Sequence, residues 1–193
     1  MFCGVWPQLF STEEDMKEIL VVSHCILNNA SKVLQDESEL ADEYRDRNEL
    51  MHAVLDKGIQ LIQLPCPEFI IYGPKRWGHV KDQFDNPFFR QECRRMLEPV
   101  LLQIEEYAND PDRFSLLGVV TVEGSPSCGG TLTCRADWGG ELDPDTVRDL
   151  IGAVRMEEAP GVFMEELRSM IEAKGLIIPF MSISEAASKI DTL

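Results

Sequence analysis

The chain has few basic residues and no long hydrophobic run. Only 18 Lys and Arg stand against 34 Asp and Glu, which gives a formal net charge of −16 over 193 residues. An acidic surface repels a phosphate backbone, so we expect no nucleic-acid partner. No segment is long and apolar enough to predict a membrane span, and the first residues lack the basic and apolar regions of a secretory signal. We therefore expect a cytoplasmic protein without a membrane partner.

The cysteines lack the spacing of the familiar metal-binding motifs. The chain contains six, with no CxxC pair and no ferredoxin-type run. Without an export signal, cysteines in a chain of this size are read as reduced thiols, metal ligands or core residues. A chain of this length can bury a core without disulfide bonds, so we expect one domain.

Apolar runs and helix signals alternate along the chain. We predict an α/β fold: a single Rossmann-like domain over residues 18–193, with a mostly parallel sheet and helices on both faces, after an N-terminal arm of residues 1–17. Pro99 should kink or split its helix. Residues 69–86 are expected to form a long loop, and residues 131–141 an irregular segment. Strands are predicted at 18–23, 59–64, 116–122 and 176–181, and helices at 39–57, from Pro87 to about Ile104, from Asp143-Pro144, at 160–174 and after a Ser184 cap.

Three of the cysteines follow predicted strands. Cys25 stands in SHCILN, Cys66 in PCPE and Cys128 in GSPSCGG. If the strands are parallel, these residues lie at the same end of the sheet, where open α/β folds place their chemistry. Three soft thiolates suit Zn²⁺ or an iron–sulfur cluster. The alternative is three unrelated buried cysteines, which are common core residues.

The segments SHCILN, PCPE and GSPSCGG, in this order and separation, resemble the 2-thiouracil desulfurase family, and more closely a TudS-related desulfidase branch. The resemblance runs from about Ile19 to Gly130 and includes the RWG and QFDNPFFR stretches. It implies a [4Fe-4S] cluster held by Cys25, Cys66 and Cys128. It also implies removal of sulfur from a small thiocarbonyl compound, thiouracil-like, with release of hydrogen sulfide. The chain has Asn-Asn-Ala at residues 28–30, where thiouracil-acting members often carry a further cysteine.

The residues around the three cysteines suggest further roles. Glu68, two positions after Cys66, is the first choice for the general acid/base, and its alternative is a structural carboxylate. Glu123 is a second, weaker choice, and His24 is expected to have a packing or supporting role. Ser125 is proposed as catalytic, while the remaining choices are for substrate binding: Asn28, Arg76, Trp77 and Ser127, with turn formation or solvated loop positions as their alternatives.

Two other functions remain open from the sequence. Cys134 could supply a fourth thiolate and close a non-catalytic metal module. Alternatively, Cys66 or Cys128 could be the nucleophile of a metal-free thiol enzyme, near His24. Either a monomer or a homodimer is compatible with the sequence.

Overall fold

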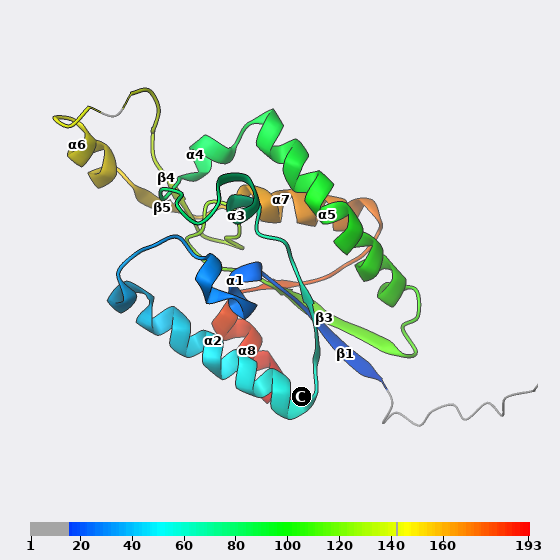
Figure 1. Cartoon of the computed structure of the whole chain (residues 1–193). Coiled ribbons are helices and arrows are strands. Elements are labelled where there is room, and N and C mark those ends of the chain that lie inside the picture. Colours follow the sequence, from blue (N-terminus) through cyan, green and yellow to red (C-terminus); the bar gives the residue numbers. More distant parts are fainter. Residues whose placement is uncertain (1–15, 142) are drawn as a thin grey trace, which may run out of the picture.

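A parallel sheet between two layers of helices forms the centre of the molecule (Figure 1). The computed structural model describes residues 16–141 and 143–193, so most of the predicted N-terminal arm lies outside the described residues. The strand order in the sheet is β2-β1-β3-β6, and all neighbouring strands are parallel. Its strands are β1 (Lys17–Val22), β2 (Gln60–Gln63), β3 (Phe114–Val120) and β6 (Phe180–Met181).

The two central strands are the most buried part of the sheet. The last four residues of β1 and of β3 are all buried, as a run of apolar residues requires when helices cover both faces. Gly118 allows β6 to lie close to β3, because a Cβ there would stand 2.4 Å from Met181 Cε and 2.9 Å from the Pro179 carbonyl oxygen. The register between β1 and β3 shifts at the same level, between Ile19 and Leu20.

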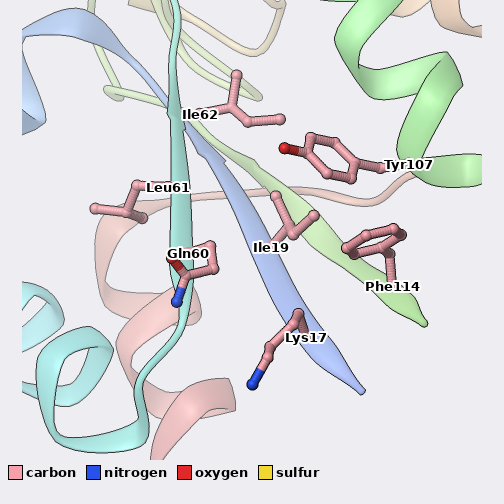
Figure 2. Close-up of a pocket in the computed structure, with 7 residues that line it drawn as sticks. All are labelled: Lys17, Ile19, Gln60, Leu61, Ile62, Tyr107 and Phe114. Atoms are coloured by element: carbon pink, nitrogen blue, oxygen red, sulfur yellow. The ribbon is translucent and has the colours of Figure 1, made fainter. Parts of the chain in front are cut away.

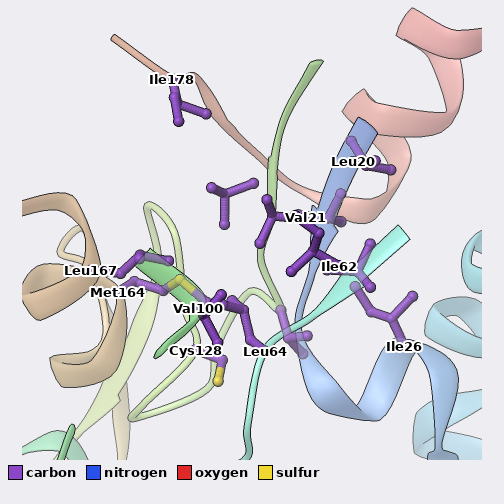
Figure 3. Packing of buried hydrophobic residues seen from close by; sticks show 14 of the residues in the cluster. Leu20, Val21, Ile26, Ile62, Leu64, Val100, Cys128, Met164, Leu167 and Ile178 are labelled. Carbon is purple, nitrogen blue, oxygen red and sulfur yellow. The ribbon is translucent and has the colours of Figure 1, made fainter. Parts of the chain in front are cut away.

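Each face of the sheet has its own pair of long helices. α2 (Glu37–Lys57) packs with α8 (Ile183–Asp191) on one face, and α5 (Pro87–Ala108) packs with α7 (Val162–Ala173) on the other (Figure 1). The core between them is a single apolar cluster, and Figure 3 shows Cys128 within it. The shorter elements are α1 (His24–Leu27), the 3₁₀ turn η2 (Asn29–Ser31), α3 (Pro67–Tyr72), α4 (Lys81–Phe84), β4 (Thr133–Arg135), α6 (Val147–Gly152) and β5 (Arg155–Glu157).

The structure confirms the predicted α/β class, with a parallel sheet covered on both faces. It also confirms the start of α5, where Asn86 caps the helix and Pro87 occupies its first position. Gly58 ends α2 in the left-handed conformation, as its sequence position indicates. No helix among the described residues is long and apolar enough to cross a membrane.

Several local predictions were wrong. The expected loop at 69–86 contains the end of α3 and all of α4, and the irregular segment at 131–141 contains β4, which pairs antiparallel with β5. β4 and β5 have three residues each, which is too short for an alternating pattern to be recognised. The predicted strand at 176–181 forms a ladder only over β6. The helix expected from Asp143-Pro144 begins at Val147, after turn residues.

Two predictions about helices, the effect of Pro99 on α5 and the capping residue of α8, also differ from the structure. α5 is one helix through Pro99, so the predicted split does not occur; Pro99 lies on the exposed side of the helix while its neighbours Leu97 and Val100 pack into the core. The carbonyl that Pro99 leaves unpaired can therefore be hydrated. Ser182, not Ser184, caps α8: its hydroxyl accepts from the N–H of Glu185, and the Glu185 carboxylate accepts from the N–H of Ser182.

Candidate functional site

The three cysteines predicted as ligands line one cavity of about 450 Å³. Cys25 lies in α1, directly after β1, and Cys66 stands between β2 and α3. Cys128 lies in the loop that follows β3. Because the three strands are parallel, their carboxyl ends meet at one edge of the sheet and bring these distant segments together. None of the three thiols is in a disulfide bond.

Short polar contacts fix the segments that carry Cys25 and Cys66. Ser23, completely buried, donates from its hydroxyl to the Val120 carbonyl oxygen over 3.0 Å and so ties the end of β1 to β3. Cys66 is the N-cap of α3, and its Sγ accepts from the N–H of Phe69 over 3.4 Å. Pro67 takes the first helical position, which needs no donor.

The loop that carries Cys128 is held by its own serine and by the start of α7. Ser125 Oγ accepts from the N–H of Cys128 over 3.0 Å. The carbonyl oxygen of Ser127 accepts from the N–H groups of Phe163 and Met164, which are unpaired donors of the first helical turn. Gly161 makes this approach possible, since a Cβ there would stand 2.5 Å from the carbonyl carbon and oxygen of Ser127.

Glu68 lies inside the cavity and makes contacts through both carboxylate oxygens. Ser127 Oγ donates to Glu68 Oε1 over 2.5 Å, and Arg76 Nε stands 3.3 Å from Glu68 Oε2. The Arg76 and Glu68 side chains are only 4% and 12% exposed. Ser125 also lines the cavity. The structure thus brings four further predicted residues together with the three cysteines: Glu68, Arg76, Ser125 and Ser127.

Glu123, the second choice for the general base, stabilises the loop through hydrogen bonds. Its carboxylate accepts from the hydroxyls of Thr121 and Thr131 and from the backbone N–H groups of residues 130–132, at 2.7–3.1 Å. Burial favours the neutral carboxyl, but these hydrogen bonds outweigh it and hold the pKa of Glu123 below its usual value. A carboxylate with this many donors is poorly suited to accept a further proton at neutral pH.

Burial raises the pKa of all three cavity thiols. The pKa of Cys25 rises to about 12, against a smaller lowering by the charge of Lys32. The pKa of Cys66 is raised by burial and lowered slightly by the N–H of Phe69, and that of Cys128 is raised well above its usual value. A nucleophilic cysteine needs the opposite shift, so these environments do not favour a metal-free thiol enzyme. A metal that binds here would displace the thiol protons.

Three predicted residues lie away from the residues that line the cavity. Asn28 is exposed at the end of α1, and Trp77 is 80% exposed. His24 is also absent from the lining. Its carbonyl oxygen accepts a hydrogen bond from the side-chain amide of Gln63. Arg76 lines the cavity, but its donors are directed to protein acceptors, Glu68 among them.

Cys134 also lines the cavity but packs into a separate small cluster. Its Sγ donates to the His79 carbonyl oxygen over 3.4 Å, and its apolar neighbours are Val80 and Ala136. The pKa of Cys134 is raised by burial, with smaller contributions from the charges of Glu68 and Asp82. Cys134 thus lines the same cavity as the other three cysteines, but its thiol is directed to a backbone carbonyl oxygen.

Sequence reasoning did not identify several residues of the lining. Lys32 pairs with Glu43 of α2 at one side of the cavity, and Met156 of β5 reaches it from the small sheet. His79 also lines it and stacks against Tyr72 at 4.9 Å between ring centroids. Of these, only His79 had a signal in the sequence, because it follows the RWG stretch. The others come from segments with no motif.

The placement of the thiols can be compared with what a bound metal group requires. Among the described residues, no set of three or more His, Cys, Asp or Glu side chains is placed to hold a single metal ion. Ligands of a [4Fe-4S] cluster need not converge in this way, because each thiolate binds a different iron atom. Three thiols from separate segments, Cys128 buried and Cys25 and Cys66 half-buried, line one cavity and are compatible with that requirement.

A second cavity, of about 390 Å³, lies at the opposite end of the sheet, near the beginnings of the three strands (Figure 2). No cysteine, histidine or carboxylate is among the residues that line it. Its polar side chains are a lysine, a glutamine and a tyrosine, so this cavity has no thiolate, imidazole or carboxylate to bind a metal. The lining consists of Lys17, Ile19, Gln60, Leu61, Ile62, Tyr107 and Phe114.

Comparison with known proteins shows a relative in an archaeon. An uncharacterized protein of Methanocaldococcus jannaschii, MJ0003, is 37% identical to this chain over 112 residues, which is 58% of this chain and 67% of that protein. The models of known protein families give no match, and no solved structure matches.

Proposed function

The chain belongs to one family with the M. jannaschii protein, and we propose that it is a Rossmann-like, iron–sulfur-dependent desulfidase. It would bind a [4Fe-4S] cluster and hydrolyse the C=S bond of a small thiocarbonyl compound to C=O, with release of hydrogen sulfide. The observation that carries this proposal is the cavity at which Cys25, Cys66 and Cys128 meet a buried carboxylate, Glu68. The resemblance of the three cysteine segments to desulfurases supplies the reaction.

In this proposal Cys25, Cys66 and Cys128 hold the cluster. A cluster held by these three thiolates would supply an iron atom without a cysteine ligand, which would act as a Lewis acid toward the substrate sulfur. Burial of Cys128 also restricts access of water to its sulfur atom.

The acid–base chemistry falls to Glu68. Hydrolysis converts R₂C=S and H₂O into R₂C=O and H₂S, so no electron is gained or lost overall, but protons must move from the water to the sulfur. Glu68 is held by Ser127 and Arg76 and can take the proton of the attacking water and return it. We assign Ser127 to the orientation of Glu68, and Ser125, which also lines the cavity, to contact with substrate.

The cavity supports a small substrate. Its volume of about 450 Å³ lies at the lower end of the range of ligand pockets, and it must hold the cluster as well. Apolar side chains from Val33, Leu40 and Val122 share the lining with the polar groups. A single thiolated heterocycle suits this mixture, whereas a thiolated nucleic acid does not suit a chain with a net charge of −16.

The direct test is anaerobic reconstitution with iron and sulfide, followed by measurement of visible absorption, iron content and sulfide release from a panel of thiocarbonyl compounds. We expect about four iron atoms per chain, and loss of both iron and activity in the Cys25, Cys66 and Cys128 triple serine variant. Cys93→Ala is the matched control, since Cys93 is a core thiol of α5 outside the cavity lining. Zinc instead of iron, or a protein that takes up no metal, would contradict the proposal.

The closed metal module makes a different prediction for Cys134. In our proposal Cys134→Ser retains the cluster and sulfide release, because its thiol donates to the His79 carbonyl oxygen and three other cysteines hold the cluster. Loss of iron in that variant, with its fold intact by circular dichroism, would favour the four-cysteine module instead.

A further inference from the structure

We propose that Arg76 is a positioning residue that holds the Cys25 and Cys66 segments in register before any metal binds. This inference rests on the proposed function only for the identity of the bound group. The sequence suggested that Arg76 clamps a substrate, but its donors serve the protein. It is placed to determine how far apart the thiols stand.

The guanidinium group of Arg76 contacts three different segments. Nη2 donates to the carbonyl oxygen of Ser31 over 2.8 Å, and Ser31 ends the turn η2 that follows Cys25. Nη1 donates to the carbonyl oxygen of Gly73 over 3.3 Å, at the end of α3, which Cys66 caps. Nε faces Glu68 Oε2 over 3.3 Å, inside the first turn of α3. One side chain thus joins the segments of two cysteines.

Glu68 extends this connection to the third cysteine. Its other oxygen accepts from Ser127 Oγ over 2.5 Å, and Ser127 directly precedes Cys128. A continuous path of hydrogen bonds therefore runs from the Cys25 segment, through Arg76 and Glu68, to the Cys128 loop. A bidentate or forked cation is the residue type that can bridge acceptors in this way, whereas a lysine offers a single charged nitrogen.

The hydrogen bonds of the sheet do not fix the positions of the three cysteine segments. β1 ends at Val22, β2 at Gln63 and β3 at Val120, so each cysteine lies beyond the last ladder hydrogen bond of its strand. Gln63, the last residue of β2, also links the Cys25 and Cys66 segments, because its side-chain amide donates to the His24 carbonyl oxygen. This hydrogen bond is exposed to solvent. The buried link is Arg76, whose side chain is 4% exposed.

The first experiment compares cluster retention in Arg76→Gln, Arg76→Lys and a matched control. Arg113→Gln is the control because Arg113 is an exposed arginine paired with Asp110 just before β3, far from the cavity. We expect Arg76→Gln to lose iron to a chelator at least tenfold faster than the parent, with a broadened electron paramagnetic resonance signal of the reduced cluster. Arg76→Lys should recover part of the retention, and Arg113→Gln should match the parent.

The second experiment uses the iron-free protein and needs no cluster. Amide hydrogen exchange should quicken at least several-fold in residues 24–32 and 66–73 of Arg76→Gln, while the strands keep their protection. If Arg76→Gln fails to fold, the Glu68→Gln, Arg76→Gln double variant removes the unpaired carboxylate and is measured in its place. Unchanged exchange and unchanged iron retention would overturn the inference. A parent protein that binds no cluster would instead overturn the proposed function, and the exchange measurement would still decide the role of Arg76.

Discussion

Glu68 is held inside the cavity by one hydroxyl and one guanidinium group, and this contact set gives it a testable role. In Glu68→Gln the amide can keep the contact with Ser127 but cannot carry a proton. We predict that sulfide release falls by about 10²–10⁴-fold, the usual contribution of a general acid–base group, while iron content stays near that of the parent. A variant with normal turnover would remove Glu68 from the mechanism.

Glu123 predicts a pH dependence of stability. Its pKa is lowered in the folded protein, so its hydrogen bonds stabilise the fold fully above the usual carboxyl pKa of about 4.5. This contribution is lost as the pH falls through the lowered value. We expect Glu123→Gln to cost about 1–3 kcal/mol at pH 7, because an amide NH₂ would face backbone N–H donors.

The measurement is urea unfolding of the parent and Glu123→Gln from pH 7 down to pH 3. The difference in unfolding free energy between the two proteins should shrink as the solution becomes acidic. A difference that stays constant over this range would show that the Glu123 carboxylate does not titrate with a lowered pKa.

At the scale of elements, the start of α7 positions the cysteine loop. Gly161→Ala would place a Cβ against the Ser127 carbonyl, so the loop or the helix must shift. We predict a loss of about 1–3 kcal/mol in unfolding free energy and weaker cluster retention, measured by urea unfolding and chelator challenge. Gly152→Ala is the control, since a Cβ at that position of α6 meets no atom within 4 Å. Equal stability of the two variants would contradict this role of α7.

The same scale shows why sequence reasoning succeeded with some elements and not with others. α2 and α5 have about twenty residues each, with end signals such as Asn86 and Gly58, so local chemistry suffices to place them. β4 and β5 form only because they pair with each other across residues 136–154, and neither has a pattern of its own.

In the candidate site, too, some features could be predicted from the sequence and others could not. The meeting of Cys25, Cys66 and Cys128 at one place could be predicted from sequence. Each follows an apolar strand, and the carboxyl ends of parallel strands lie at the same edge of a sheet. Arg76 was recognised as unusual but was assigned to a substrate, since only tertiary structure shows that its acceptors are Ser31, Gly73 and Glu68. The Lys32 and Glu43 pair had no local signal.

For the whole molecule, a bound cluster should be a major source of stability. It would join segments that follow three of the four strands of the central sheet. A group that binds only the folded state stabilises it by about 2.7 kcal/mol at a concentration of 100 times Kd. Removal of the cluster under anaerobic conditions should therefore lower the Tm by about 5–10 °C.

Scanning calorimetry of the reconstituted and the chelator-treated protein checks this prediction. The triple serine variant serves as the control, and its Tm should not respond to iron and sulfide. Identical Tm values for the two forms of the parent would mean that the three thiols do not hold a common group.

The order of the strands has a consequence for protein synthesis. β1 is made first, but its neighbour β3 is made only after α5, and the loop with Cys128 needs the first turn of α7 as well. A chain still on the ribosome exposes Cys25 and Cys66 several seconds before Cys128 can join them, at a synthesis rate of about 5–20 residues per second. Iron delivered during translation would meet an incomplete set of thiols. If the protein binds the proposed cluster, its insertion would therefore follow synthesis of the chain at least through α7.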